Sequence, residues 1–104
     1  MKKPNFDIPA SFTLFGEEWE TRFIDDLKNS DTLGQCDDAH GKIDLHVRLS
    51  GEEVPPCRLE GTFYHELVHA ILYSGCYHDL TRDEHLVQHI GGCLHQFMKS
   101  RKFE

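Results

Sequence analysis

The chain has 104 residues, and a chain of this length predicts a single domain spanning residues 1–104. Hydrophobic residues make up 38% and charged residues 28%, a balance typical of soluble globular proteins and unlike that of disordered chains. The formal net charge is −7, and the eleven Lys and Arg residues are scattered. Because phosphate recognition needs a basic patch, no nucleic-acid partner is expected.

The sequence also indicates the cellular compartment in which we expect the protein. No apolar run approaches the roughly 18 to 20 residues of a membrane helix, so no membrane partner is expected. The start, MKKPNFDIPASF, lacks the apolar segment of a signal peptide, which favours a cytoplasmic location. Cys36, Cys57, Cys76 and Cys93 form no CxxC pair, which argues against a zinc ribbon. In a reducing compartment we expect these cysteines to be free thiols, mostly buried.

The first part of the chain has the pattern of strands. The runs 12–15 and 19–23 flank Gly16-Glu17-Glu18, which predicts a hairpin. A helix from Glu17 to Leu27 is the alternative for the second run. Residues 33–41 are rich in turn-forming residues and predict no strand.

A further strand is predicted over residues 43–49. Apolar and polar residues alternate there, which is typical of a half-buried strand. Its apolar face is formed by Ile43, Leu45, Val47 and Leu49. Gly51 and Pro55-Pro56 prevent the strand from continuing.

The C-terminal half predicts two helices. The first runs from about Arg58 to Ser74 and is capped by Gly75. The second has Thr81 as its N-cap and continues to about Lys99. Strands followed by helices indicate an α+β fold, in which a small N-terminal β-sheet packs on the first helix and on a second, C-terminal helix.

The first of these helices is apolar around most of its circumference, which leaves one narrow polar arc. The apolar positions are Leu59, Phe63, Leu67, Val68, Ala70, Ile71 and Leu72, and the polar arc holds Thr62, His65, Glu66, His69 and Tyr73. A helix with so wide an apolar surface is central to its domain. Its polar arc is therefore expected to line a cleft.

Residues 65–69, HELVH, match the H-E-x-x-H pattern of zinc enzymes. Side chains four residues apart share one helix face, so His65 and His69 can bind one Zn²⁺ ion. The ion lowers the pKa of its water to about 7, and Glu66 can take the proton as general base. Two histidines at this spacing can also occur by chance. A chance match, however, need not fall on the only polar arc of a buried helix.

A catalytic zinc ion needs a third protein ligand. Leu72 and Gly75 stand where the longer metzincin pattern requires a glycine and a histidine, so that pattern is absent. The remaining candidates follow the first helix. They are His78, Glu84, His85 and His89.

The second helix favours Glu84 among these candidates. Glu84 and His89 lie at opposite borders of its apolar stripe, whereas His85 points away from the stripe. Glu84 shares its border with Gly91, where a glycine would let the two helices approach closely. The alternative role of Glu84 is to close a capping box with Thr81.

The stretch from about Leu33 to Met98 resembles the small zincin-type metallopeptidases common in phage genomes, akin to minimal gluzincins and ImmA-like proteins. The resemblance rests on the strand around residues 41–45, the segment 62–71 that contains the HExxH pattern, and a glutamate that opens the next helix. It implies that Glu84 is the third zinc ligand. It also implies that the strand 43–49 forms the rim of the cleft, where a peptide or protein substrate adds as a further strand.

Several other polar residues have weaker patterns. Tyr73, Tyr77 and His78 are candidates to stabilise an oxyanion, with an ordinary packing or surface role as the more common alternative. His40, His46 and His95 have no partner at a suitable spacing, and we expect them to be solvated.

The leading hypothesis is thus a zinc metallopeptidase with Glu66 as its catalytic base. One alternative is a zinc amidase that acts on a non-protein substrate, because a lone HExxH specifies the metal chemistry better than the substrate. A nuclease is disfavoured by the net charge. From another class, a zinc-binding interaction module without turnover is the third possibility.

Overall fold

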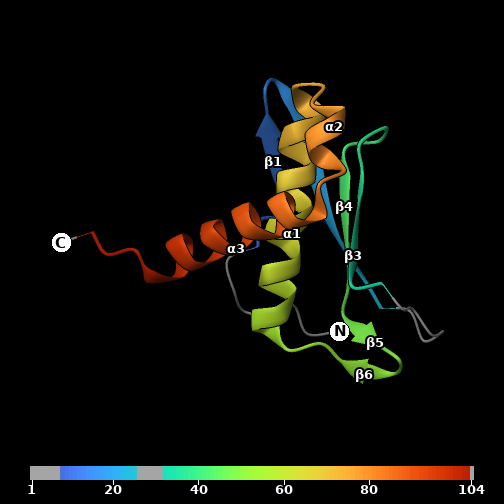
Figure 1. Cartoon of the computed structure of the whole chain (residues 1–104). Coiled ribbons are helices and arrows are strands. Elements are labelled where there is room, and N and C mark those ends of the chain that lie inside the picture. Colours follow the sequence, from blue (N-terminus) through green and yellow to red (C-terminus); the bar gives the residue numbers. More distant parts are fainter. Residues whose placement is uncertain (1–7, 26–31, 104) are drawn as a thin grey trace.

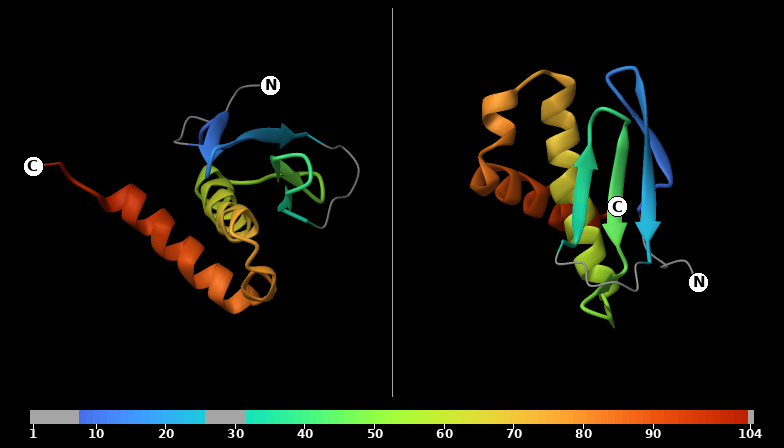
Figure 2. Two further views of the ribbon diagram at one scale, coloured as in Figure 1. Left: turned by 90° about the horizontal axis from the view of Figure 1, so that it is seen from above. Right: turned by 90° about the vertical axis from the view of Figure 1, so that its right-hand side faces the viewer.

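The strands precede the helices along the chain, and the predicted α+β fold is confirmed. The computed structural model describes residues 8–25 and 32–103, and residues 1–7, at the start of the segment used to predict the location, lie outside these ranges. The elements are β1 (Ser11–Leu14), β2 (Glu17–Ile24), β3 (Gly34–Asp37), β4 (Lys42–His46), β5 (Arg48–Leu49), β6 (Glu52–Glu53), α1 (Pro56–Ser74), α2 (His78–Thr81) and α3 (Glu84–Ser100) (Figure 1). Helix α1 lies between the sheet and α3 (Figure 2). Within the described ranges, no helix is long and apolar enough to cross a membrane.

The predicted hairpin is formed by β1 and β2, which pair in antiparallel fashion. Its turn is shorter than predicted and consists of Phe15 and Gly16, with φ of 48° and 87°. Positive φ at both central residues is the requirement of a two-residue type I′ turn. The alternative helix is wrong as far as Ile24, and Leu27 lies outside the described residues.

The main sheet has the strand order β1-β2-β4-β3, which places β4 in the middle and β3 at an edge. Strand β3 lies in the segment predicted to be turns, so this prediction is wrong. Its residues, GQCD, have little strand propensity. Antiparallel pairing with β4 across the tight turn at residues 38–41 provides the backbone hydrogen bonds that make them a strand.

The predicted strand 43–49 is divided in two. Ile43 and Leu45 are fully buried and Val47 nearly so, which confirms the predicted apolar face. The strand nevertheless ends at His46. After a bend at Val47, β5 turns away to pair with β6.

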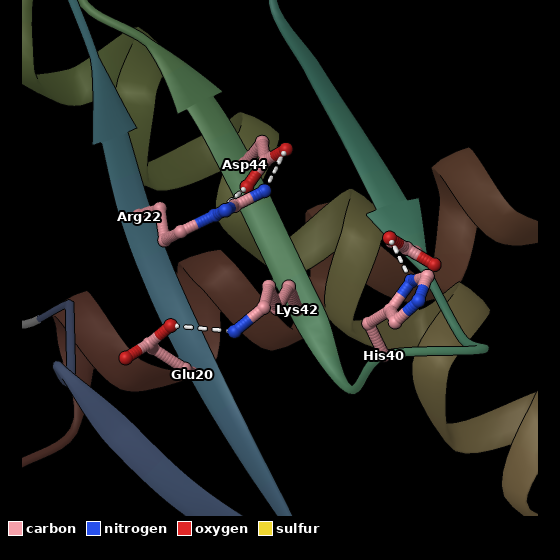
Figure 3. Close-up of polar contacts among 6 residues, drawn as sticks. Glu20, Arg22, His40, Lys42 and Asp44 are labelled. Carbon is pink, nitrogen blue, oxygen red and sulfur yellow. Dashed lines mark hydrogen bonds and ion pairs between the residues drawn. The ribbon is translucent and has the colours of Figure 1, made fainter.

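The opposite face of the sheet carries charges that lie in register (Figure 3). Glu20 faces Lys42 and Arg22 faces Asp44 across the parallel strands β2 and β4. The side chains of each pair are in contact, at 2.9 Å for Lys42 Nζ and Glu20 Oε1 and 2.7 Å for Arg22 Nε and Asp44 Oδ1. Opposite charges on neighbouring strands stabilise one register over a shifted one.

The α1–α3 contact depends on Gly91. A Cβ atom at this position would lie 3.0 Å from His65 Cα, closer than ordinary packing allows. Glycine therefore lets α3 approach α1 at the level of the HExxH pattern, as predicted. The next residue, Gly92, has no atom within 4 Å of the corresponding position.

These two glycines provide a matched test of the helix contact. Gly91→Ala is expected to lower the free energy of unfolding by about 1–3 kcal/mol, because the added methyl group overpacks the contact. Gly92→Ala is expected to raise it by roughly 0.5–1 kcal/mol, because alanine is the better helix former and meets open space. Denaturant unfolding of both variants measures the difference. Equal effects would show that the close approach does not limit the packing.

The cysteines differ from expectation in burial. All four lie in the described ranges with free thiols. Only Cys36 is half-buried, whereas the other three are exposed, namely Cys57, Cys76 and Cys93. The prediction that most thiols are buried is therefore wrong.

Candidate metal centre

Helices α1 and α3 bring His65, His69 and Glu84 together. The Nε2 atom of His65 lies 3.0 Å from Glu84 Oε1, and the Nε2 atom of His69 lies 3.3 Å from Glu84 Oε2. The imidazole centroids are 5.1 Å apart. One ligand atom from each residue lies within 4.8 Å of the others, so the group could hold a metal ion.

The start of α3 explains why Glu84 reaches this position. Asp83, and not Thr81, is the N-cap, and its carboxylate accepts a hydrogen bond from Leu86 N at 3.1 Å. The predicted N-cap Thr81 and the alternative capping box are therefore wrong, and Glu84 faces α1 as the first residue of the helix. His85 and His89, the other candidates on this helix, are exposed and lie outside the group.

Each imidazole is oriented by a second hydrogen bond. His65 Nδ1 lies 2.8 Å from Gln88 Oε1, and His69 Nδ1 lies 2.8 Å from the hydroxyl of Thr81, which is buried at the end of α2. Because an amide oxygen only accepts, this contact is a hydrogen bond when His65 carries a proton on Nδ1. This tautomer directs the lone pair of Nε2 toward Glu84, and the same tautomer satisfies His69. Metal-binding histidines commonly have such partners.

The three groups therefore present lone pairs to one another. Burial lowers the pKa of His69, against the opposing effect of Glu84, and this favours the neutral imidazole. A neutral Nε2 and a carboxylate oxygen are both acceptors, so a separation of about 3 Å between them requires a proton or a metal ion to bridge them. A His-His-Glu set is one that Zn²⁺ accepts, and it leaves a coordination position open. The donor set thus fits a divalent metal ion.

Glu66 lies in the same region as a largely buried carboxylate. Its residue exposure is 9%, and within the described ranges no hydrogen bond to its carboxylate is found. Burial raises the pKa of Glu66, while the neighbouring His65 opposes this shift and Glu84 adds to it. Glu66 lines two cavities at this site, so its carboxylate faces open space beside the candidate ligands, where it can contact a group that is not part of the chain.

Two cavities meet at these residues. The first, here termed the metal cavity, has a volume of about 520 Å³ and is lined by Gly34, Gln35, Cys36, His65, Glu66, His69, Tyr73, Thr81, Arg82 and Glu84. The second, here termed the side cavity, has about 450 Å³ and is lined by Leu33, Gly34, Arg58, Gly61, Thr62, His65, Glu66, Gln88, Gly92 and His95. Both volumes are within the range of ligand sites. They share Gly34, His65 and Glu66, so they adjoin beside the candidate metal centre.

Strand β3 forms the sheet edge that borders these cavities. His46 N donates to Leu33 O at 2.8 Å, and in an antiparallel ladder the bonded pairs alternate along the strand. The backbone groups of Gly34 and Cys36 therefore point to the free edge. Strand β4 is paired with β2 on one edge and with β3 on the other, so it has no edge to offer a substrate. The implied role of residues 43–49 as the rim of the cleft is therefore wrong, and β3 is the strand at the rim.

Two further side chains in the metal cavity have distinct properties. The Tyr73 ring follows His69 on the same helix face, with centroids 6.4 Å apart. Burial, helped by the negative charge of Glu66, raises the pKa of Cys36 to about 12, so its thiol stays protonated. The other two oxyanion candidates, Tyr77 and His78, are exposed and do not line this cavity.

The predicted solvation of three histidines is only partly right. His40 is exposed and pairs with Asp37 at the β3–β4 turn. His46 instead buries its Nδ1 atom, which has no hydrogen-bond partner in the part of the chain that the structure describes. His95 lies 3.0 Å from the buried carboxylate of Glu60, so its predicted solvation is wrong. No local spacing indicates this pair, because 35 residues separate its members.

The arrangement combines three convergent side chains that could hold a metal ion, a largely buried carboxylate in the same cavity and a strand edge that no other described strand covers. Sequence reasoning identified the first two but missed the hydrogen-bond partners Thr81 and Gln88 and the edge strand β3. The signal for Gln88 was its position four residues after Glu84 on the same helix face. In comparisons with known proteins, the chain matches no family model, no curated protein sequence and no solved structure.

Proposed function

We propose that the protein is a zinc-dependent hydrolase, specifically a metallopeptidase with Glu66 as general base. The observation that carries the proposal is the convergence of His65, His69 and Glu84 beside a buried carboxylate that has no hydrogen-bond partner in the described ranges. A binding module would need the metal ligands only. A carboxylate that faces the cavity next to these ligands supports proton transfer during turnover.

In the proposed mechanism, one group of residues binds the metal ion and a second group orients its ligands. When bound, zinc would acidify a water molecule and polarise the carbonyl group of the substrate. His65, His69 and Glu84 would hold the ion, while Gln88 and Thr81 keep the two imidazoles in the required tautomer and orientation.

Glu66 would then act as the base and afterwards as the acid. One of its carboxylate oxygens accepts the proton of the attacking water, since no donor among the described residues is hydrogen-bonded to it. The protonated Glu66 returns this proton to the leaving amine when the C–N bond breaks. Tyr73 lines the same cavity and offers a hydroxyl for the developing oxyanion.

The free edge of β3 favours a peptide as the substrate. Extended peptides bind exposed sheet edges through main-chain hydrogen bonds, and the outer backbone groups of Gly34 and Cys36, beside the metal cavity, pair with no other described strand. A non-peptide amide would make no use of this edge. The edge therefore supports a peptidase over an amidase of other substrates.

Metal content and hydrolysis together test the proposal. The purified protein, freed of any histidine tag, is expected to contain one zinc ion per chain and to cleave unfolded proteins. A chelator should abolish cleavage, and added Zn²⁺ should restore it. Metal content is measured by atomic emission and cleavage by mass spectrometry. A metal-free protein under zinc-replete conditions would contradict the proposal, and zinc binding without cleavage would favour the interaction module.

A further inference from the structure

The side cavity extends from the candidate metal centre toward the N-terminal end of α1. Arg58, Thr62 and His65 line it and follow one another at intervals of four and three residues, so they share one face of the helix. Arg58 is exposed, and its guanidinium has no hydrogen-bond or ion-pair partner among residues 8–25 and 32–103. The cavity thus joins a candidate metal ligand at one end to an uncompensated cation at the other.

Glycine residues keep this cavity open. Gly92 lies within α3, and a Cβ atom there would meet nothing within 4 Å. A glycine inside a helix costs roughly 0.5–1 kcal/mol relative to alanine. Since no close contact at Gly92 requires this residue, the free volume of the side cavity offers a reason for it.

The charges around the cavity are asymmetric. His95 also lines the cavity, and its Nε2 atom lies 3.0 Å from Glu60 Oε1. Lys99 Nζ lies 3.3 Å from the same carboxylate oxygen. Glu60 is buried beneath them and is thereby compensated. Glu66 is at the opposite end, beside the metal centre. Of the described residues that line the cavity, Arg58 is therefore the cation that remains available to an anionic ligand.

We propose that the side cavity is a substrate subsite in which Arg58 binds a carboxylate group, and this inference rests on the proposed peptidase function. Arg58 and His65 are seven residues apart, which is about 10 Å along the helix, or about three residues of extended peptide. Antiparallel addition to β3, the more stable pairing, directs the C-terminal side of the substrate toward Leu33 and this cavity. The carboxylate is therefore an Asp or Glu side chain, or the C-terminus, within three residues after the cleaved bond.

Cleavage mapping tests the subsite directly. The zinc-loaded wild type digests a peptide mixture, and mass spectrometry maps the bonds that it cuts. Cut sites should be enriched in Asp, Glu or a free C-terminus within three residues on the C-terminal side. Arg58→Glu should remove this enrichment, with a roughly tenfold loss of kcat/KM for acidic substrates, the range of one charge-assisted hydrogen bond. Glutamate in the first turn of α1 is compatible with folding.

A binding measurement separates the subsite from turnover and identifies the source of the carboxylate. Zinc-loaded Glu66→Gln protein is titrated with three fluorescent forms of one peptide. The peptide is one that the wild type cleaves or, if the wild type cleaves none, one chosen from the mixture. One form has Glu near its amidated C-terminus, one has Gln and a free C-terminus, and one has Gln and an amide. At least one carboxylate form should bind roughly tenfold more tightly than the third. This difference should disappear when Arg58→Glu is added.

The control is Lys102→Glu, which changes the net charge equally at an exposed position that lines neither cavity. Cleavage without a carboxylate preference, or a preference that both charge reversals reduce equally, would overturn the subsite and leave the peptidase function intact. Absence of cleavage with carboxylate binding that depends on Arg58 would overturn the peptidase function and support the subsite. Absence of both would overturn both proposals.

Discussion

Replacing Glu66 with Gln is expected to reduce kcat for peptide hydrolysis by at least about 10²–10⁴-fold, the usual contribution of general acid–base catalysis. Glutamine has nearly the same shape but cannot accept the proton of the attacking water. The metal ligands are unchanged, so zinc should remain at one ion per chain. Single-turnover cleavage and metal analysis of the same sample measure the two effects. Full activity in this variant would falsify the role of Glu66.

The stability of the Glu66→Gln protein provides the control for this result. Burial raises the pKa of Glu66, so the ionised carboxylate destabilises the folded state. This effect is absent below the ordinary glutamate pKa of about 4.3 and complete above the raised pKa of the folded protein. Metal-free Glu66→Gln should therefore be at least as stable as the wild type at pH 7, and its advantage should shrink toward pH 4. Thermal unfolding at both pH values measures this, and a lower Tm at pH 7 would point to misfolding.

Sequence reasoning succeeded where one local pattern determines the structure. Helix α1 has a periodic apolar surface over 19 residues, and four-residue spacing places His65 and His69 on one face of any α-helix. The role of Gly91 in the contact between α1 and α3 could be predicted because its position at the border of the apolar stripe of α3 follows from the same periodicity. These features require no knowledge of distant segments.

The features that sequence reasoning missed depend on contacts between distant segments. Strand β3 is imposed by its pairing with β4 and not by the propensity of its own residues. Thr81 and Asp83 are both good N-caps, and only the register of α3 against α1 determines that Asp83 caps the helix while Thr81 contacts His69. Sequence periodicity could not identify the partner of His95, because Glu60 lies on another helix.

Replacing Glu84 with Ala is expected to have the largest effect on metal binding. Loss of a hydrogen-bond partner of a ligand typically costs about 10–100-fold in affinity, and loss of the ligand itself should cost more. Thr81→Val provides the comparison, since it removes the partner of His69 while a side chain of similar shape is retained. Competition with a chelating dye measures the zinc affinity of both variants. The affinity should fall from the wild type to Thr81→Val and further to Glu84→Ala.

The metal-free form of Glu84→Ala distinguishes ligation from a structural role. Asp83 caps α3, so Glu84 is not needed for the helix to start, and its side chain is 66% exposed, so its contacts with the two imidazoles contribute little to stability. Metal-free Glu84→Ala should therefore unfold at the same denaturant concentration as the wild type, whereas a capping role predicts a loss of about 0.5–2 kcal/mol. His85→Ala, at the exposed neighbouring position, should preserve both stability and zinc affinity. If His85→Ala weakened zinc binding more than Glu84→Ala, the third ligand would be His85, and α3 would have to rotate about its axis to present it.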